Sequence, residues 1–219
     1  MSSRPERPTG AKRRDLHFLS RLLTALKLTY HPKSYNHSMP ETDLQARARK
    51  IKLILMDVDG TLTDGGVCLM ATPGRDAISE LKIFNSRDGA GLKLASIMGL
   101  RTGFITGRSS EAVRQRAREL SVDYVHLGQE TKTAAFEQCL KESGVSAEET
   151  AWIGDDLPDI PLAQRAGLAI AVADAAPELK AASHYTTHAA GGHGAAREVV
   201  ELILKSQNRW AEAIPKSLA

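Results

Sequence analysis

The segment Ile51-Lys-Leu-Ile-Leu-Met56-Asp57-Val-Asp59-Gly-Thr61 decides the fold of this chain. Its first half is an apolar run broken only by Lys52, which is typical of a strand buried in a parallel sheet. Asp57 and Asp59 follow directly at the end of that strand. Because Asp-Gly alone is ordinary turn chemistry, the meaning of the two acids depends on what the rest of the chain brings to them.

The remainder of the chain alternates between strand and helix patterns. Strands are expected at 104–105, 124–127, 151–153, 168–172 and 184–187, with helices at 91–98, 110–120, 132–143, 161–166 and 195–204. This rhythm predicts an α/β fold, a three-layer Rossmann-like parallel sheet with helices on both faces. A small β-hairpin departs from it, with strands at 67–70 and 78–84 flanking the turn signal Thr72-Pro-Gly-Arg75.

Polar residues follow the predicted strands at one edge of the sheet. Thr106 comes after the second strand, Asp155 and Asp156 after the fourth, and Lys132 opens the helix after the third. Ligands bind beyond the carboxyl ends of such strands. The sequence therefore gathers acids, a hydroxyl and an amine on one rim, together with Asp57 and Asp59.

The residue types on this rim suit phosphoryl transfer. Carboxylates held close together repel unless a cation lies between them, and oxygen ligands favour Mg²⁺. Asp57 is the candidate to attack phosphorus, and Asp59 is the candidate to protonate the leaving alcohol and activate water. Thr106 and Lys132 would hold the phosphoryl oxygens, where negative charge spreads during transfer. Taken alone, Thr106 would be interpreted as part of a strand-to-helix connection, and Lys132 as a solvated residue of a helix.

Composition excludes several other classes. The chain has 219 residues, a formal net charge of +3 and only 5% aromatic residues, which argues against nucleic-acid binding. It has no apolar run of about 18 residues, so no membrane span is expected. Cys68 and Cys139 lack metal-ligand spacing and indicate free thiols in a reducing compartment, the cytoplasm.

The N-terminal part differs in character from the rest. Residues 1–48 are basic and broken by prolines. We expect residues 1–38 to be a disordered or extra N-terminal extension and 39–219 to form a single domain, with Met39 as a hypothetical true start. Leucines 16, 19, 23 and 26 lie at helical spacing, so an amphipathic helix on a membrane surface is the alternative interpretation.

Four segments in order resemble the motifs of the haloacid dehalogenase superfamily of phosphohydrolases: Asp57-Val-Asp-Gly-Thr-Leu-Thr-Asp64, Thr106-Gly-Arg108, Lys132 and Gly154-Asp-Asp-Leu-Pro-Asp159. The resemblance spans residues 51 to about 205. It implies that Asp57 is the nucleophile, Asp59 the acid/base, and Thr106 and Lys132 the phosphoryl ligands. It also implies a Mg²⁺ site made by Asp57, the backbone carbonyl of Asp59, and Asp155. The P-type ATPases of this superfamily carry Thr at the position of Asp59, so Asp59 argues for hydrolysis.

The intervals between these motifs hold no cap domain, which leaves the substrate or another subunit to cover the site. Segments 82–91, 128–132, 171–175 and 191–198 resemble the capless members that hydrolyse an eight-carbon sugar acid phosphate in lipopolysaccharide precursor synthesis. That resemblance implies a homotetramer in which hairpins pack together and a neighbouring subunit completes each site. It also implies substrate contacts from Asp59, Asn85, Ser86, Arg87, Asp88, Gly89, Lys93, Arg108, Arg116 and Lys132.

This chain departs from the resemblance at two positions, and alternatives remain. Lys93 and His193 stand where relatives carry Arg, which removes a bidentate fork from each place. A capless phosphatase for a nine-carbon sialic-type sugar phosphate is the second enzyme hypothesis. A non-catalytic interaction domain and a receiver domain phosphorylated on Asp are the other classes. The five motif residues Asp57, Asp59, Thr106, Lys132 and Asp155 favour hydrolysis over both.

Overall fold

The computed structural model describes residues 42–71 and 78–216. The predictions for residues 1–38, for Met39 and for the Thr72–Arg75 turn lie outside the described residues. No described helix is long and apolar enough to cross a membrane.

The described residues contain a central parallel sheet of six strands in the order β5-β4-β1-β6-β7-β8. β1 lies between β4 and β6, with Met56 level with Phe104 on one side and Ile153 on the other. All four residues of β1 are buried, as the apolar run predicted. The strands are β1 Leu53–Met56, β4 Arg101–Ile105, β5 Tyr124–His126, β6 Thr150–Gly154, β7 Leu168–Ala171 and β8 Tyr185–Thr186.

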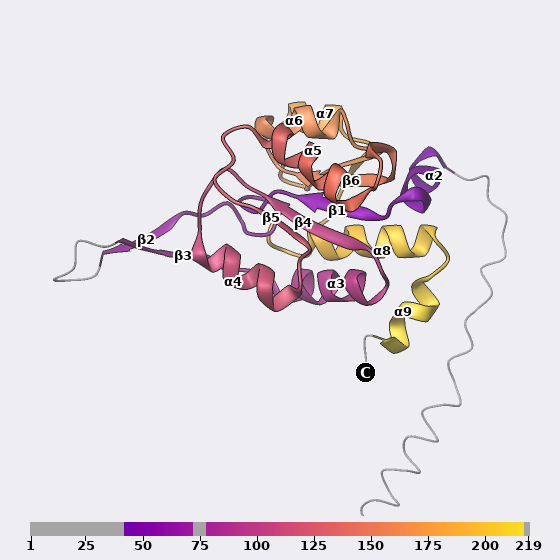
Figure 1. The fold of residues 1–219 in the computed structure, drawn as a ribbon, viewed down its shortest axis with the longest axis horizontal. Coiled ribbons are helices and arrows are strands. Elements are labelled where there is room, and N and C mark those ends of the chain that lie inside the picture. The colour runs from indigo at the N-terminus through magenta and orange to yellow at the C-terminus, as the bar shows by residue number, and fades with distance from the viewer. Residues whose placement is uncertain (1–41, 72–77, 217–219) are drawn as a thin grey trace, which may run out of the picture. The chain divides into compact units, whose positions relative to one another are not determined.

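Helices cover both faces of this sheet, which confirms the three-layer prediction (Figure 1). On one face lie α5 Lys132–Ser143, α6 Ile160–Ala163 and α7 Pro177–Ala182. On the other lie α3 Ser86–Ile97, α4 Glu111–Leu120, α8 Ala195–Ser206 and α9 Trp210–Lys216. α2 Asp43–Lys50 packs against α8, and two 3₁₀ turns, η1 Ala147–Glu149 and η2 Leu157–Asp159, flank β6.

Helix α3 begins five residues before the predicted start at Gly91. Asn85 caps it, accepting a hydrogen bond from the Arg87 backbone N–H at 2.8 Å. Glycine disfavours helix formation, so the sequence around Gly89 and Gly91 did not predict the first turn of α3. Packing explains Gly91, because an added Cβ would lie 2.9 Å from the Arg197 Cα of α8. Helices α2, α7 and α9 were not predicted, and the predicted helix at 161–166 ends at Ala163.

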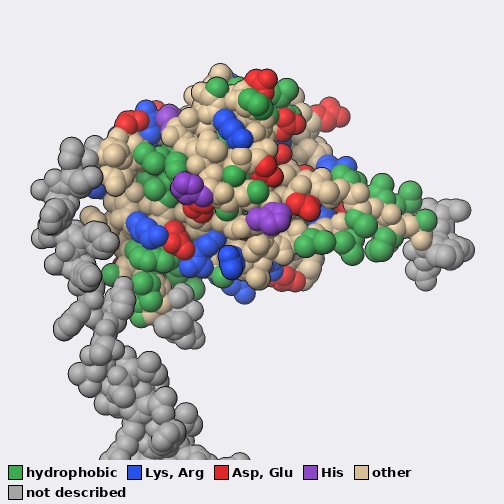
Figure 2. Space-filling model, turned by 180° about the vertical axis from the view of Figure 1, so that it is seen from behind, with side chains coloured by type: hydrophobic (Ala, Val, Ile, Leu, Met, Phe, Trp, Pro, Cys, Tyr) green, Lys and Arg blue, Asp and Glu red, His purple; other side chains and the backbone are tan. Residues whose placement is uncertain are grey.

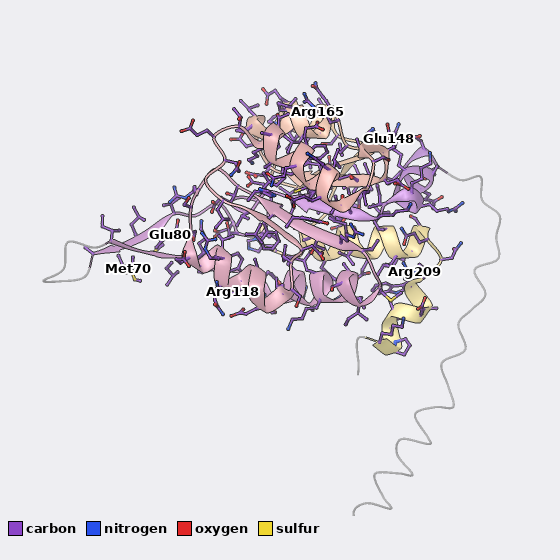
Figure 3. All side chains as sticks on the ribbon, in the orientation of Figure 1. Met70, Glu80, Arg118, Glu148, Arg165 and Arg209 are labelled. Carbon is purple, nitrogen blue, oxygen red and sulfur yellow. The ribbon has the colours of Figure 1, made fainter. Side chains whose placement is uncertain are left out.

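The predicted hairpin forms between β2 Cys68–Ala71 and β3 Ile78–Leu81, which pair antiparallel. It projects from the body of the domain, with Glu80 near its base and Met70 farther out (Figure 3). Hydrophobic side chains gather over this projection on the face that Figure 2 shows. The exposed apolar side chains of the hairpin segment are Val67, Leu69, Met70, Ile78, Leu81 and Ile83. Such a patch marks an interaction surface.

Candidate active site

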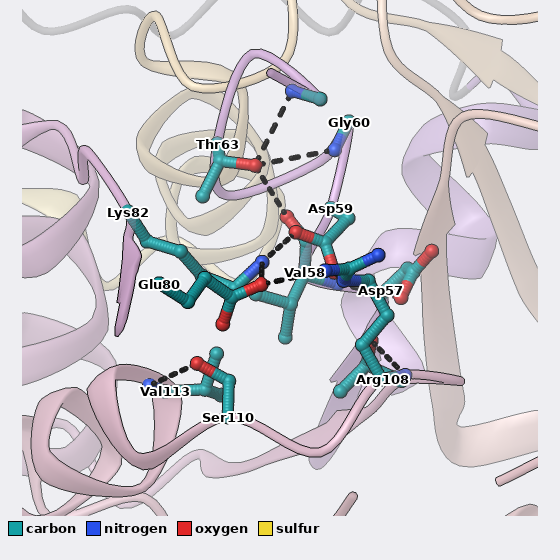
Figure 4. Close-up of polar contacts among 12 residues, drawn as sticks. Asp57, Val58, Asp59, Gly60, Thr63, Glu80, Lys82, Arg108, Ser110 and Val113 are labelled. Carbon is teal, nitrogen blue, oxygen red and sulfur yellow. Dashed lines mark hydrogen bonds and ion pairs between the residues drawn. The ribbon is translucent and has the colours of Figure 1, made fainter. Parts of the chain in front are cut away.

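A tight turn after β1 carries the two acids of the first motif. The carbonyl oxygen of Val58 accepts backbone N–H bonds from Thr61, Leu62 and Thr63 at 2.8 to 3.3 Å. The Thr63 hydroxyl donates to the same carbonyl and accepts from the Gly60 N–H (Figure 4). The Asp57 N–H donates to the Ile153 carbonyl of β6 at 3.0 Å, which fixes the start of the turn to the sheet.

A buried ion network surrounds the predicted nucleophile. Lys132 Nζ lies 2.7 Å from Asp57 Oδ2 and 2.6 Å from Asp159 Oδ1. Burial works against the charge of Lys132, but the two carboxylates outweigh it and hold its pKa above the usual value. Burial raises the pKa of Asp57 to about 6, although Lys132 opposes the shift. The structure thus brings Asp57 and Lys132 together as the motifs implied.

Three acids at this point form a site that suits a cation. Oxygen atoms of Asp57, Asp155 and Asp159 all lie within 4.8 Å of one another. Burial, with the charges of Asp57 and Asp159, raises the pKa of Asp155 to about 7. A Cβ on Gly60 would lie 2.0 Å from Asp155 Oδ2, so the turn approaches this carboxylate at a residue that has no side chain. An all-oxygen set whose members repel one another fits Mg²⁺.

Thr106 and Arg108 close the other side of an open cleft of about 470 Å³. Thr106 is buried, and its hydroxyl accepts the Arg108 N–H at 3.4 Å. Arg108 is half exposed and reaches toward Asp59, with Nε 3.9 Å from Oδ2. The cleft is lined by Asp57, Asp59, Thr106, Gly107, Arg108, Gln129, Glu130, Thr131, Lys132, Thr133, Pro158 and Pro161.

The other residues implied as substrate contacts do not line this cleft in the described part of the chain. Asp88 is buried, with its carboxylate accepting the backbone N–H bonds of Gly194 and Arg197 at the start of α8. Arg116 lies over the Phe84 ring at 5.8 Å and pairs with Glu119. The remaining members of this set lie on α3 or at its cap: Asn85, Ser86, Arg87, Gly89 and Lys93.

The loop at Gly191 packs against the first motif of its own chain. Gly192 N–H donates to the Thr61 carbonyl at 2.9 Å, and Gly191 N–H donates to Asp174 Oδ1 at 2.8 Å. A Cβ on Gly191 would lie 1.7 Å from the Gly60 carbonyl oxygen. This loop therefore supports the turn that carries Asp57.

Sequence reasoning gave no role to two residues that organise the site. Asp159 is wholly buried, holding Lys132 through Oδ1 and the backbone N–H groups of Asp155 and Asp156 through Oδ2. The side chain of Lys82 is buried as well, and its ammonium group is paired with Asp59. Asp159 had a signal in the three acids of 155–159, and Lys82 had one in the charged alternation Glu80, Lys82 within an apolar strand.

Comparisons with known proteins agree with this geometry. The haloacid dehalogenase-like hydrolase family matches residues 127–199. The 3-deoxy-D-manno-octulosonate 8-phosphate phosphatase of Salmonella typhi is 40% identical over 177 residues, which cover 81% of this chain and 92% of the relative. The chain therefore spans nearly the whole length of that phosphatase.

Solved structures give the same result. The Moraxella catarrhalis 3-deoxy-D-manno-octulosonate 8-phosphate phosphatase, in complex with a magnesium ion, a phosphate ion and a KDO molecule, is 39% identical with a TM-score of 0.74. The match covers 80% of this chain and 97% of that one. The cobalt-bound Haemophilus influenzae deoxy-D-mannose-octulosonate 8-phosphate phosphatase is 34% identical with a TM-score of 0.70, covering 77% of this chain and 99% of that one.

The parallel sheet with an acidic cluster at its carboxyl edge defines a haloacid dehalogenase-like hydrolase, and the chain belongs to that family. Its curated relatives are phosphatases, and the chain is accordingly a phosphoric monoester hydrolase. Between Asp57 and Lys132 the described residues hold a hairpin in the place of a cap domain.

Proposed function

We propose that this chain hydrolyses 3-deoxy-D-manno-octulosonate 8-phosphate to the free sugar acid and phosphate, using Mg²⁺, in lipopolysaccharide precursor synthesis. The observation that carries the proposal is the convergence of Asp57, Lys132, Asp155 and Asp159 within one buried cluster beside an open cleft. The identity of 40% to phosphatases named for this substrate supports the choice of sugar.

The reaction assigned to these residues has two steps. In the first, an Asp57 carboxylate oxygen bonds to phosphorus while the bond to the sugar oxygen breaks, and Asp59 donates a proton to that oxygen. In the second, Asp59 takes a proton from water, whose oxygen bonds to phosphorus and releases phosphate and free Asp57. Lys132, held by Asp159, and Thr106 face the phosphoryl oxygens.

Asp57, Asp155 and the backbone carbonyl of Asp59 would hold Mg²⁺, which supplies positive charge that offsets repulsion between the nucleophile and the phosphate. Asp159 is the third acid of the cluster, but its Oδ1 already binds Lys132 and its Oδ2 binds two backbone N–H groups. We therefore assign Asp159 to Lys132 rather than to the cation.

The remaining parts of the proposal concern assembly and the substrate's far end. The apolar hairpin supports a homotetramer in which a neighbouring subunit completes each site. In that arrangement Asn85, Ser86, Arg87, Lys93 and Arg116 would face substrate across the subunit contact, whereas Asp88 and Gly89 are buried in their own chain and would support that segment from beneath. We also propose that residues 39–219 form one domain, with residues 1–38 an extension, in a cytoplasmic enzyme.

A panel of eight- and nine-carbon sugar acid phosphates tests the proposed activity. Phosphate release is measured for each with Mg²⁺ and with a chelator, and Asp57→Asn serves as the inactive control. We expect the highest kcat/KM for 3-deoxy-D-manno-octulosonate 8-phosphate and loss of turnover with the chelator. Preference for a nine-carbon substrate would assign the second candidate, and no release from any compound would refute the proposal.

A further inference from the structure

The end of strand β3 presents two charged side chains to the active site. Strand β3 ends at Leu81, so Glu80 lies in the strand and Lys82 is the residue that follows it. Leu81 and Ile83 are exposed apolar residues of the hairpin. Glu80 and Lys82 instead contact residues of the cleft, and Figure 4 shows them side by side next to Asp59 and Arg108. The hairpin thus contributes charged groups to its own subunit's site.

Lys82 makes its main contact with one oxygen of Asp59. Its side chain is only 1% exposed, and its ammonium group donates to Asp59 Oδ1. The other oxygen, Oδ2, is buried and has no hydrogen-bond partner among the described residues. Arg108 Nε is the charged group on that side, at 3.9 Å. The two oxygens of Asp59 are therefore distinguished, because one is engaged and the other is unpartnered.

Glu80 holds both neighbouring cations. Its Oε1 lies 3.4 Å from Lys82 Nζ and 2.8 Å from Arg108 Nη2. Burial alone would raise the pKa of Glu80, but the Ser110 hydroxyl, Arg108 and Lys82 outweigh it and lower the pKa. Ser110 in turn caps α4 through the Val113 N–H. Glu80 therefore fixes Lys82 on one side and keeps Arg108 from moving onto Asp59.

We propose that Lys82, braced by Glu80, is the positioning residue of Asp59. It engages Oδ1 so that Oδ2 is the oxygen that exchanges a proton with the leaving group and with water. Without Lys82, the Asp59 side chain is free to rotate toward Arg108, the remaining cation nearby, and Oδ2 leaves its position. The inference rests on the proposed role of Asp59 as acid/base, and Lys82 itself belongs to none of the four motifs.

The test compares two leaving groups in the full-length Lys82→Met variant. Single-turnover release of the sugar from 3-deoxy-D-manno-octulosonate 8-phosphate needs a proton from Asp59, whereas release of p-nitrophenolate from p-nitrophenyl phosphate does not. We expect sugar release to fall by ~10²-fold, the scale of a lost general acid, and p-nitrophenolate release to fall by less than about tenfold. Asp59→Asn should show the same selectivity between the two substrates, with KM little changed.

Three further variants make the result decisive. Lys82→Arg retains a cation and should recover part of the sugar release. Glu80→Gln keeps Lys82 in the protein and should lower sugar release several-fold more than p-nitrophenolate release. It therefore provides the test if Lys82→Met does not fold. Lys52→Met removes a surface lysine paired with Glu149 and should change neither rate. Sedimentation of each variant checks that assembly is unchanged.

Two results would overturn the inference. Equal losses on both substrates would show that Lys82 supports the fold rather than Asp59, and unchanged rates in Lys82→Met would show no role at all. Failure of the proposed function is distinguishable from both results, because it would appear as no phosphate release by the parent chain from any sugar phosphate.

Discussion

Gly191→Ala tests whether the loop before α8 sets the position of the nucleophile. The added Cβ would lie 1.7 Å from the Gly60 carbonyl oxygen and 2.6 Å from its carbon, both backbone atoms of the first-motif turn. Neither partner is a flexible side chain that can rotate away. The backbone of Gly191 does not have a positive φ, so the substitution acts through steric overlap and not through backbone strain.

The size of the effect follows from that overlap. Relieving it requires the two backbone segments to separate by about 1 Å, and a displacement of that size at a catalytic group costs on the order of 10²-fold in rate. Overpacking of a tight contact costs about 1–3 kcal/mol of stability. We therefore expect kcat to fall by ~10²-fold, with a loss in the free energy of unfolding that still leaves the protein folded.

The assay is phosphate release together with thermal unfolding. The matched control is Gly144→Ala, at the C-terminal cap of α5, where φ is +66° and nothing lies within 4 Å of the added Cβ. That control should lose about 1–2 kcal/mol through backbone strain and keep its kcat. If Gly191→Ala kept kcat within about twofold of the parent chain, the reasoning that this loop positions Asp57 would be refuted.

Three further predictions concern charge, pH and assembly. Lys132→Met leaves Asp57 and Asp159 facing each other without their cation. We therefore expect the free energy of unfolding of the metal-free protein at neutral pH to fall by about 3–5 kcal/mol, and kcat to fall by at least ~10²-fold. Lys141→Met, at an exposed position on the same helix, should change neither quantity. The pKa values of Asp57 and Asp155 are raised to about 6 and about 7, so between pH about 4 and 7 the folded metal-free protein holds more protons than the unfolded chain and its stability falls as pH rises. Melting in chelator should therefore drop from pH 5 to pH 8, and Mg²⁺ should raise the melting temperature more at pH 8; a flat or rising profile in chelator would contradict the cluster. The double substitution Leu69→Glu with Ile78→Glu should shift the protein to a smaller species in sedimentation without loss of helicity, while Ile97→Glu, equally exposed but on α3, should not; an unchanged sedimentation coefficient would contradict hairpin assembly.

The parts of the fold set by local pattern were predictable from the sequence. The apolar run before Asp57 gave β1, and helix α5 lies where the pattern from Lys132 to Ser143 placed it. Strand ends then placed Thr106 and Asp155 beside Asp57, because neighbouring parallel strands end at one edge. The sheet and the centre of the site both follow from these signals.

The parts set by contacts distant in sequence were not predictable. Asp88 caps α8, and its partners Gly194 and Arg197 lie more than a hundred positions away. Gly91 looks like a helix breaker until the approach of α8 is known. Lys82 follows β3, and its contact with Asp59 depends on how the hairpin meets the body of the domain, which the alternation of side chains leaves open.

The central claim is that Asp57 forms a covalent bond to phosphorus, and one measurement addresses it directly. The wild-type enzyme is quenched during turnover of its sugar phosphate and treated with borohydride, which reduces an acyl phosphate to an alcohol. Tandem mass spectrometry then reads the peptide that contains both Asp57 and Asp59. We expect homoserine at position 57 alone, and none in a quench made without substrate. Reduction at Asp59, or no reduction alongside full activity of Asp57→Asn, would contradict that claim.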